Sequence, residues 1–138
     1  MFEDKIIVAQ LMTKTITVGG LSTKFSQVAE FFTSFKVHHL PICENDVLIG
    51  MVSYTDLLKF IIAQLDGGKS VSIEDLDAVF NVSDIMTKNL VSVAPKDPIE
   101  KARELLSGGV FQALPVVEDG KIVGILSNKD IVRLDAQL

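Results

Sequence analysis

One sequence pattern occurs twice in this chain, at a constant offset of 74 residues. Residues 50–56 and 124–130 both read glycine, two apolar residues, serine, two variable residues and aspartate. The same offset aligns Met12 with Met86 in a Met-Thr-Lys stretch, and it aligns a Leu-Pro pair at residues 40–41 with another further along the chain. Because three separated matches share one offset, the sequence predicts an internal repeat.

Each copy of the pattern lies where a predicted strand meets a predicted helix. Short β-rich apolar runs precede Ser53 and Ser127, and apolar residues at helical spacing follow them. Asp56 and Asp130, three residues after the serines, complete a capping-box pattern, and such a cap is worth about 1 kcal/mol. A helix N-terminus also attracts phosphate, and an ionised aspartate can accept both hydrogens of a ribose diol. Capping and nucleotide binding are therefore both open, and they do not exclude each other.

With these residues in place, the chain resembles a tandem pair of CBS (cystathionine-β-synthase) domains, known as a Bateman module. Both copies match the family's Gly-h-x-Ser/Thr-x-x-Asp/Asn signature. The family's Leu-Pro strand is matched at residues 39–42 and 113–116, and its opening at residues 11–13 and 85–87. The resemblance covers nearly all of residues 5–136.

The predicted fold is α/β (α+β), with two β-α-β-β-α repeats. We expect repeat 1 at residues 5–65, an inter-repeat linker with a short helix at 66–81, and repeat 2 at 82–136, together forming one module. Because a unit near 50 residues buries too little surface to be secure alone, we expect the copies to pack together. The expected arrangement is sheet against sheet about a pseudo-twofold axis, and the resemblance implies the same.

Individual elements follow from local patterns. We expect a first helix over residues 4–12 and opening strands at 16–18 and 89–93. Tight hairpin turns are expected at 44–46 and 118–120. Two predicted helices carry apolar residues that we expect to face inward: Phe25, Val28, Phe32 and Phe35 in the first repeat, and Leu76, Val79 and Phe80 in the linker.

The resemblance also implies a ligand site. In the family, the residue before Leu-Pro lines the cleft between repeats, which points to His39 and Ala113, and the stretch after Met-Thr supplies backbone groups to adenine. Lys129 adds a cation inside the second motif only. The first repeat departs from the family pattern at residues 19–21, so we expect the second cleft to be the better site. The candidate ligand-binding residues are Thr15, Ile16, His39, Leu40, Pro41, Ser53, Asp56, Asn89, Leu90, Ala113, Leu114, Pro115, Ser127, Lys129 and Asp130.

Composition and the remaining motifs argue against other classes of protein. A net charge of −5 and a pI near 4.9 disfavour nucleic-acid binding. There is no apolar run of 18 residues and no signal-peptide pattern, so we expect no membrane span and a cytoplasmic location. The single cysteine, Cys43, excludes an internal disulfide, and His38 and His39 would point to opposite faces of a strand and so are poorly placed to share a metal. No catalytic arrangement is recognisable.

The expected function is therefore regulatory and not enzymatic. The resemblance implies a stand-alone sensing module that binds an adenine nucleotide (AMP, ADP or ATP) or S-adenosylmethionine as a regulatory ligand, with no cofactor. We expect a homodimer that signals to an effector protein. The alternative is a scaffold or dimerisation module whose clefts are degenerate and unoccupied.

Overall fold

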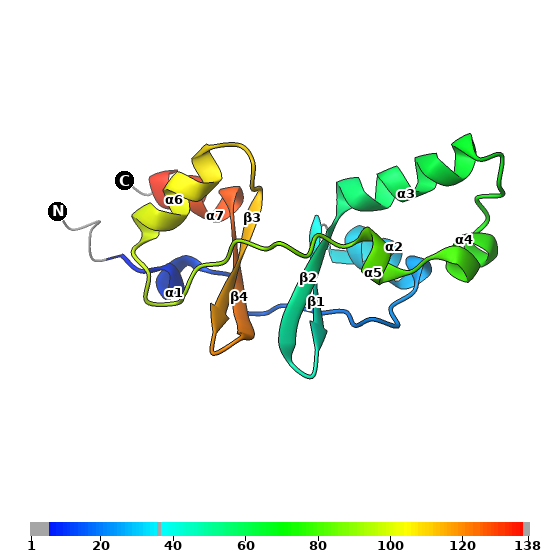
Figure 1. Ribbon diagram of the computed structural model, residues 1–138. Coiled ribbons are helices and arrows are strands. Elements are labelled where there is room, and N and C mark those ends of the chain that lie inside the picture. The colour runs from blue at the N-terminus through cyan, green and yellow to red at the C-terminus, as the bar shows by residue number, and fades with distance from the viewer. Residues whose placement is uncertain (1–5, 36, 137–138) are drawn as a thin grey trace. The chain divides into compact units, whose positions relative to one another are not determined.

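The structure is a computed structural model that describes residues 6–35 and 37–136 (Figure 1). Residues 4 and 5, expected in the first helix and at the start of repeat 1, lie outside this range. The described residues form a mixed α/β fold, which confirms the predicted class. The helices are α1 (Val8–Leu11), α2 (Phe25–Phe35), α3 (Tyr54–Asp66), α4 (Ile73–Val79), α5 (Val82–Ile85), α6 (Ile99–Ser107) and α7 (Asn128–Ala136), and the strands are β1 (His39–Glu44), β2 (Val47–Ser53), β3 (Ala113–Glu118) and β4 (Lys121–Ser127).

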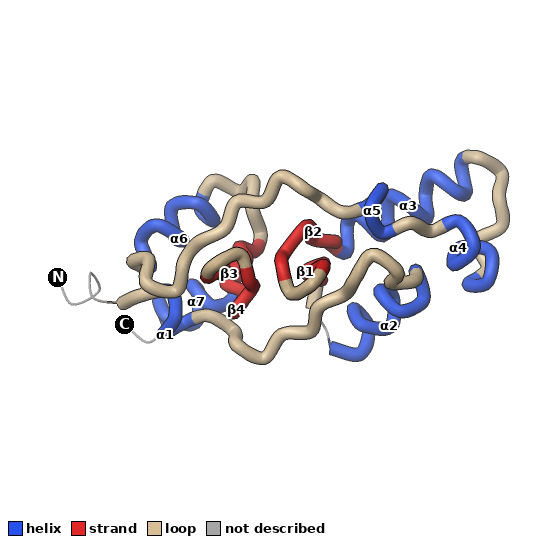
Figure 2. Tube along the Cα trace, turned by 60° about the horizontal axis from the view of Figure 1, so that its bottom comes forward, coloured by secondary structure: helices blue, strands red, loops and turns tan. Residues whose placement is uncertain are grey.

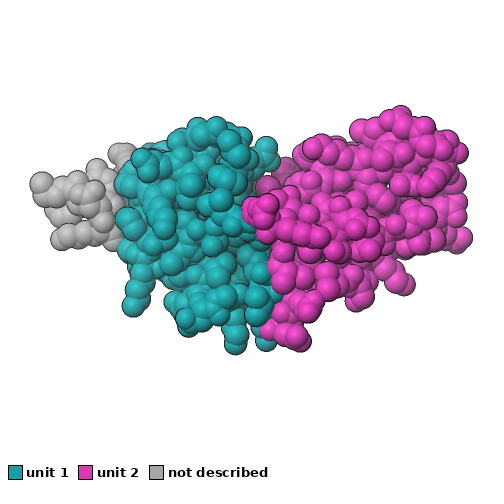
Figure 3. Space-filling view, in the orientation of Figure 1, with its two compact units in different colours: residues 1–16, 46–48, 90–138 teal, residues 17–45, 49–89 magenta. Residues whose placement is uncertain are grey.

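The chain forms two compact units that do not follow the sequence repeats (Figure 3). Unit 1 comprises residues 1–16, 46–48 and 90–138, and unit 2 comprises residues 17–45 and 49–89. Helix α1 therefore belongs with the elements of the second repeat, and α5 belongs with those of the first. Within each unit, the helices lie on one side of the hairpin (Figure 2).

Both hairpins close with turns in which two consecutive residues have positive φ. The values are 52° and 68° at Asn45 and Asp46, and 53° and 80° at Asp119 and Gly120. Type I′ turns require this conformation, so both predicted tight turns are confirmed. The strand order is β1-β2-β4-β3, and β3 pairs antiparallel with β4 from Ala113 opposite Ser127 onward. Strands β2 and β4 pair at a single position, Val47 opposite Lys121, and both of these residues belong to unit 1.

The predicted opening strands at residues 16–18 and 89–93 are wrong. Residues 16–18 form no strand, and only the next residue, Gly19, makes a parallel bridge, with Ile42. Within residues 89–93, only Val93 makes one, with Val116. The Gly19 amide donates to the Pro41 carbonyl at 2.8 Å, and the next ladder bond would need an N–H from Pro41 itself. Proline has no N–H, so the ladder stops there, and Pro115 ends it in the same way in the second copy.

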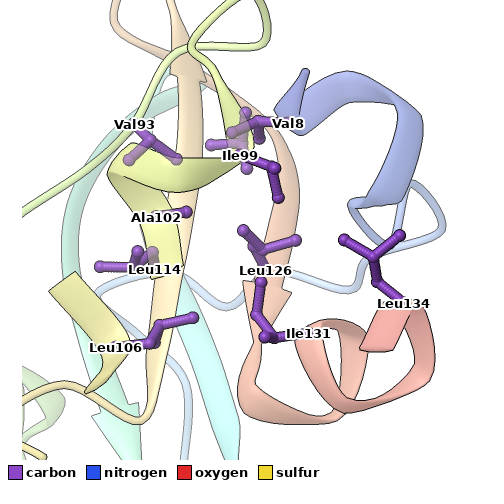
Figure 4. Close-up of a cluster of buried hydrophobic side chains, with 10 residues drawn as sticks. Val8, Val93, Ile99, Ala102, Leu106, Leu114, Leu126, Ile131 and Leu134 are labelled. Atoms are coloured by element: carbon purple, nitrogen blue, oxygen red, sulfur yellow. The ribbon is translucent and has the colours of Figure 1, made fainter. Parts of the chain in front are cut away.

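The core of unit 1 is aliphatic and is built from both ends of the chain (Figure 4). Val8 of α1 is fully buried beside Ile99 of α6, although 91 positions separate them in sequence. The ten buried residues of this core are Val8, Val93, Ile99, Ala102, Leu106, Leu114, Val116, Leu126, Ile131 and Leu134.

The core of unit 2 is partly aromatic and includes the inter-repeat linker. The rings of Phe25, Phe60 and Phe80 lie with centroids 5.1–5.9 Å apart, so Phe80 fixes the end of α4 to the core. Asp77 of α4 accepts from the amide and the hydroxyl of Ser26 at 2.8 Å each, and so caps α2. The inter-repeat linker is thus packed against α2 and the core of unit 2.

Two side chains expected to face inward in this unit do not. Phe35 is 62% exposed at the last position of α2, and Val79 is 52% exposed at the end of α4. Both are the last residue of their helix.

Candidate functional site

The first Ser-x-x-Asp turn joins β2 to α3 within unit 2. The Asp56 carboxylate oxygen Oδ2 accepts from the Ser53 amide at 2.8 Å, and Ser53 Oγ accepts from the Asp56 amide at 3.1 Å. The Tyr54 amide donates to the His38 carbonyl at 2.9 Å, which ties the turn to the start of β1. The predicted capping box is therefore formed, and it uses one oxygen of the Asp56 carboxylate.

The second turn joins β4 to α7 within unit 1, with a different hydrogen-bond pattern. Asp130 Oδ2 accepts from the Ser127 amide at 2.9 Å and from the Ser127 hydroxyl at 3.3 Å. Asp130 is only 3% exposed, and its Oδ1 lies 3.8 Å from Nη2 of Arg133, one turn along the helix. In this turn the carboxylate accepts both hydrogen bonds from Ser127 and also lies within ion-pair distance of Arg133.

The glycine that opens each motif is explained by packing. A Cβ added at Gly124 would lie 2.6 Å from the sulfur of Met12 and 3.0 Å from the Thr13 carbonyl oxygen. A Cβ at Gly50 would collide in the same way with the Met86 side chain. Only glycine allows the methionine this close approach.

The Met-Thr stretches are exchanged between the two copies of the motif. Thr13 of the first repeat and Ile125 in the second motif exchange two backbone hydrogen bonds, of 2.8 and 3.0 Å. Thr87 of the second repeat and Met51 in the first motif exchange two backbone hydrogen bonds, of 2.9 and 3.0 Å. Each motif is therefore paired, through backbone hydrogen bonds, with the Met-Thr stretch of the other repeat.

This exchange decides which candidate residues share a unit. Thr15 and Ile16 belong to unit 1 with Ser127 and Asp130, whereas Asn89 belongs to unit 2 with Ser53 and Asp56. Leu90 falls in unit 1. Repetition of the Met-Thr-Lys stretch was visible in the sequence, but the hairpin on which each copy packs was not.

The Leu-Pro stretches place one accessible side chain beside each motif. Leu40, Pro41, Leu114 and Pro115 are buried, so they serve mainly as core. His39 and Ala113 are half-buried, and Ala113 lies directly opposite Ser127 in the β3–β4 register. Of each triplet, the residue before Leu-Pro is the one whose side chain remains available to a ligand.

His39 is electrostatically connected to the first turn. Burial lowers its pKa below the ordinary value of 6.5, and the neighbouring His38 lowers it further. The Asp56 carboxylate lies near enough to raise the pKa of His39 and so partly offsets both effects. The predicted residues His39 and Asp56 are therefore brought together, and His39 is held towards its neutral form.

The lysines that follow the two Met-Thr stretches, and the lysine inside the second motif, are exposed. Lys14, Lys88 and Lys129 make no ion pair within the described residues, so their charges are open to an anionic ligand. Residues 6–35 and 37–136 contain no group of three or more histidine, cysteine or acidic residues that could hold a metal. Among the described helices, none is long and apolar enough to cross a membrane.

Comparison with known protein families matches the CBS domain model twice, at residues 8–63 and 82–137. The chain belongs to the CBS domain family. It is 30% identical over 129 residues to a homoserine O-acetyltransferase of Methanohalobium evestigatum, covering 92% of this chain but only 24% of the enzyme. The chain thus spans about a quarter of the length of that relative.

A further relative is a CBS-pair protein. CBSX2, a chloroplastic protein of Arabidopsis thaliana, is 30% identical over 136 residues, which cover 85% of this chain and 57% of CBSX2. A crystal structure of CBSX2 in complex with AMP has a TM-score of 0.78 at 31% identity, covering 95% of this chain and 96% of that one.

The CBS domain pair of MJ0100 in complex with 5′-methylthioadenosine and S-adenosyl-L-methionine has a TM-score of 0.77 at 22% identity, covering 96% of this chain and 97% of that one. This second likeness establishes the shared fold.

Proposed function

We propose that this chain is a regulatory module that binds an adenine nucleotide at its two Ser-x-x-Asp turns, with AMP as the first candidate. The observation that carries the proposal is the pair of intact turns, each with an aspartate three residues after its serine and a half-buried side chain from the Leu-Pro stretch beside it. CBSX2, the AMP-bound relative, supports the choice of ligand at 31% identity.

The proposed roles follow from the chemistry of each group. The aspartates accept hydrogen bonds from the ribose hydroxyls, and the serines and the first amides of α3 and α7 face phosphate. His39 and Ala113 line the adenine side, together with the backbone of Thr15 and Ile16 in unit 1 and of Asn89 in unit 2. We also propose that Leu90 contributes to the same contacts, and that Lys129 pairs with phosphate.

The proposed output is regulation of another protein. Ligand binding favours one conformation of the module, and it shifts that equilibrium only by the difference in its affinity for the two conformations. We propose that the module acts as a homodimer in the cytoplasm and that it signals to an effector protein without catalysing a reaction itself.

A thermal-shift panel tests this function directly. AMP, ADP, ATP, S-adenosylmethionine and GMP are each added to the purified chain, and its melting temperature is recorded. At a hundredfold excess over Kd, a bound ligand adds about 2.7 kcal/mol of stability. We expect AMP to raise the melting temperature and GMP to leave it unchanged. Failure of every adenine compound would contradict the proposal.

A second function is favoured by one specific observation. Each aspartate already accepts a hydrogen bond from the amide of the serine in its own turn, so helix capping alone accounts for the two turns. In that case the chain is a scaffold or dimerisation module with unoccupied clefts. Substitution of the aspartates would then lower stability only, and nucleotides would have no effect on the melting temperature.

A further inference from the structure

The two motif aspartates have different surroundings. The side chain of Asp130 is 4% exposed, and both of its oxygens face a polar partner: Oδ2 faces Ser127, and Oδ1 faces Nη2 of Arg133 at 3.8 Å. The Arg133 side chain is 69% exposed, so it lies largely in solvent while one guanidinium nitrogen stays within ion-pair distance of the carboxylate.

The first copy lacks this cation. Lys59 occupies the position of Arg133 at the repeat offset, yet no cation among the described residues lies within ion-pair distance of Asp56. Asp56 is also only half-buried, and its Oδ2 alone is used by the capping box. Its second oxygen therefore remains available as an acceptor.

We propose that Arg133 competes with the ribose of a nucleotide for the Asp130 carboxylate, so that the Asp56 turn is filled first. This inference rests on the proposed nucleotide-binding function and adds an order of occupancy to it. A guanidinium and a ribose diol both donate to carboxylate oxygens, and Oδ1 is the oxygen that the cap leaves to Arg133. A ligand must displace Arg133, and the exposed side chain has room to move into solvent.

The order of occupancy is opposite to that expected from the family pattern, which favoured the second site. The reason is a residue outside the seven-residue motif. Arg133 also lies in the last turn of α7, where a cation stabilises the helix dipole. That purely structural role would change the melting temperature of the free chain without changing its affinity for a ribose.

Variants in which only one of the two turns is intact isolate the effect of Arg133 on ligand binding. Asp56→Ala leaves the Asp130 turn as the intact site, and Asp130→Ala leaves the Asp56 turn. Adenosine is the probe, because it carries the ribose and no phosphate charge. In the Asp56→Ala background, Arg133→Gln should tighten adenosine binding about two- to fivefold, the range expected when an exposed ion pair is removed. Arg133→Lys, which keeps the cation, should restore weak binding.

Lys59→Gln in the Asp130→Ala background is the matched control and should leave adenosine affinity unchanged. Raising the KCl concentration supplies a readout that does not depend on folding of the Arg133 variants. In Asp56→Ala itself, salt should screen the ion pair and tighten adenosine binding. The inference would be overturned if Arg133→Gln left adenosine binding unchanged or weaker and if salt had no effect on adenosine binding by Asp56→Ala. The proposed function would still stand in that case, provided that the unaltered chain binds AMP. Absence of adenosine and AMP binding from every variant and from the unaltered chain would overturn both.

Discussion

The sulfur of Met12 lies against the backbone of Gly124, so closely that a Cβ at residue 124 would come within 2.6 Å of it. These residues belong to different repeats, and their contact accompanies the backbone pairing of Thr13 with Ile125. The motif glycine thus has a structural purpose, independent of any ligand. It lets the Met-Thr stretch of one repeat dock beside the Ser-x-x-Asp turn of the other.

Substitution of this glycine should destabilise unit 1. Gly124→Ala places a methyl group against the Met12 side chain and the Thr13 carbonyl oxygen, and overpacking of this kind costs about 1–3 kcal/mol. Urea denaturation followed by circular dichroism measures the loss. Gly20→Ala is the control, because its new Cβ would meet its nearest atom at an ordinary 3.8 Å. Equal stability of the two variants would contradict the packing explanation.

Much of this fold could be predicted because its signals are local. The turns at residues 44–46 and 118–120 carry residues that tolerate positive φ, and α2 and α3 follow their apolar periodicity. The opening strands could not be predicted from the β-rich residues alone. Their length is set by Pro41 and Pro115 in the neighbouring strands, which have no N–H to continue the ladder.

The turns and stretches that carry the candidate site residues were predictable, and the way in which they assemble was not. The 74-residue offset identified both Ser-x-x-Asp turns and both Met-Thr stretches, but an offset carries no information about which copy packs on which. The ion pair of Asp130 with Arg133 was missed for a related reason. Arginine three residues after an acid on a helix is common, and only the burial of Asp130 distinguishes this pair.

His39 should make stability pH-dependent. Its pKa is lowered in the folded chain by burial and by His38, so below about pH 6.5 the unfolded chain takes up a proton that the folded chain refuses. Stability should therefore fall as the pH drops below 6.5 and level off once folded His39 also titrates. Urea midpoints between pH 5 and 8 measure this slope.

Variants of the two histidines identify the source of this slope. His39→Gln should flatten it, whereas His38→Gln should keep most of it, because burial is the larger cause of the shift. The same slope in His39→Gln as in the unaltered chain would show that another group is responsible.

Lys129 should distinguish phosphorylated from unphosphorylated ligands. It is exposed in the first turn of α7 beside Ser127, so Lys129→Ala should weaken AMP about two- to fivefold and leave adenosine nearly unchanged. Lys121→Ala is a matched control, since it lies at the opposite end of β4, about 20 Å from Ser127. Equal losses for AMP and adenosine in calorimetric titrations would show that Lys129 does not face phosphate.

An exposed apolar stripe on α3 should hold two copies of the chain together. Its members, at 43–54% exposure, recur at helical spacing, and they are Tyr54, Leu58, Ile62 and Leu65. Light scattering should give twice the 15.1 kDa chain mass, and Leu58→Glu with Ile62→Glu should reduce it to one chain. Val132→Glu, at the position on α7 that the repeat offset aligns with Leu58, is the control and should remain dimeric. A single-chain mass for the unaltered protein would contradict the prediction.

The two motif aspartates should bind the ribose of AMP, and calorimetric titration of AMP into the unaltered chain and into the double variant Asp56→Ala/Asp130→Ala tests this most directly. A carboxylate that accepts ribose hydroxyls contributes roughly 1.5–3 kcal/mol, so each single change should weaken AMP binding at its own turn about 10–100-fold and leave the other turn intact. The double change should abolish detectable binding. Loss of the caps should also lower stability by about 0.5–1 kcal/mol per turn.

Ser72→Ala is the matched control, since it removes the cap of α4, where Ser72 Oγ accepts from the Asp75 amide at 3.2 Å, and leaves both motifs intact. It should lower the melting temperature and keep AMP affinity unchanged. We predict that AMP binds the unaltered chain and Ser72→Ala equally and does not bind the double variant. A double variant that melts early yet binds AMP as the unaltered chain does would contradict the claim and leave the aspartates as helix caps alone.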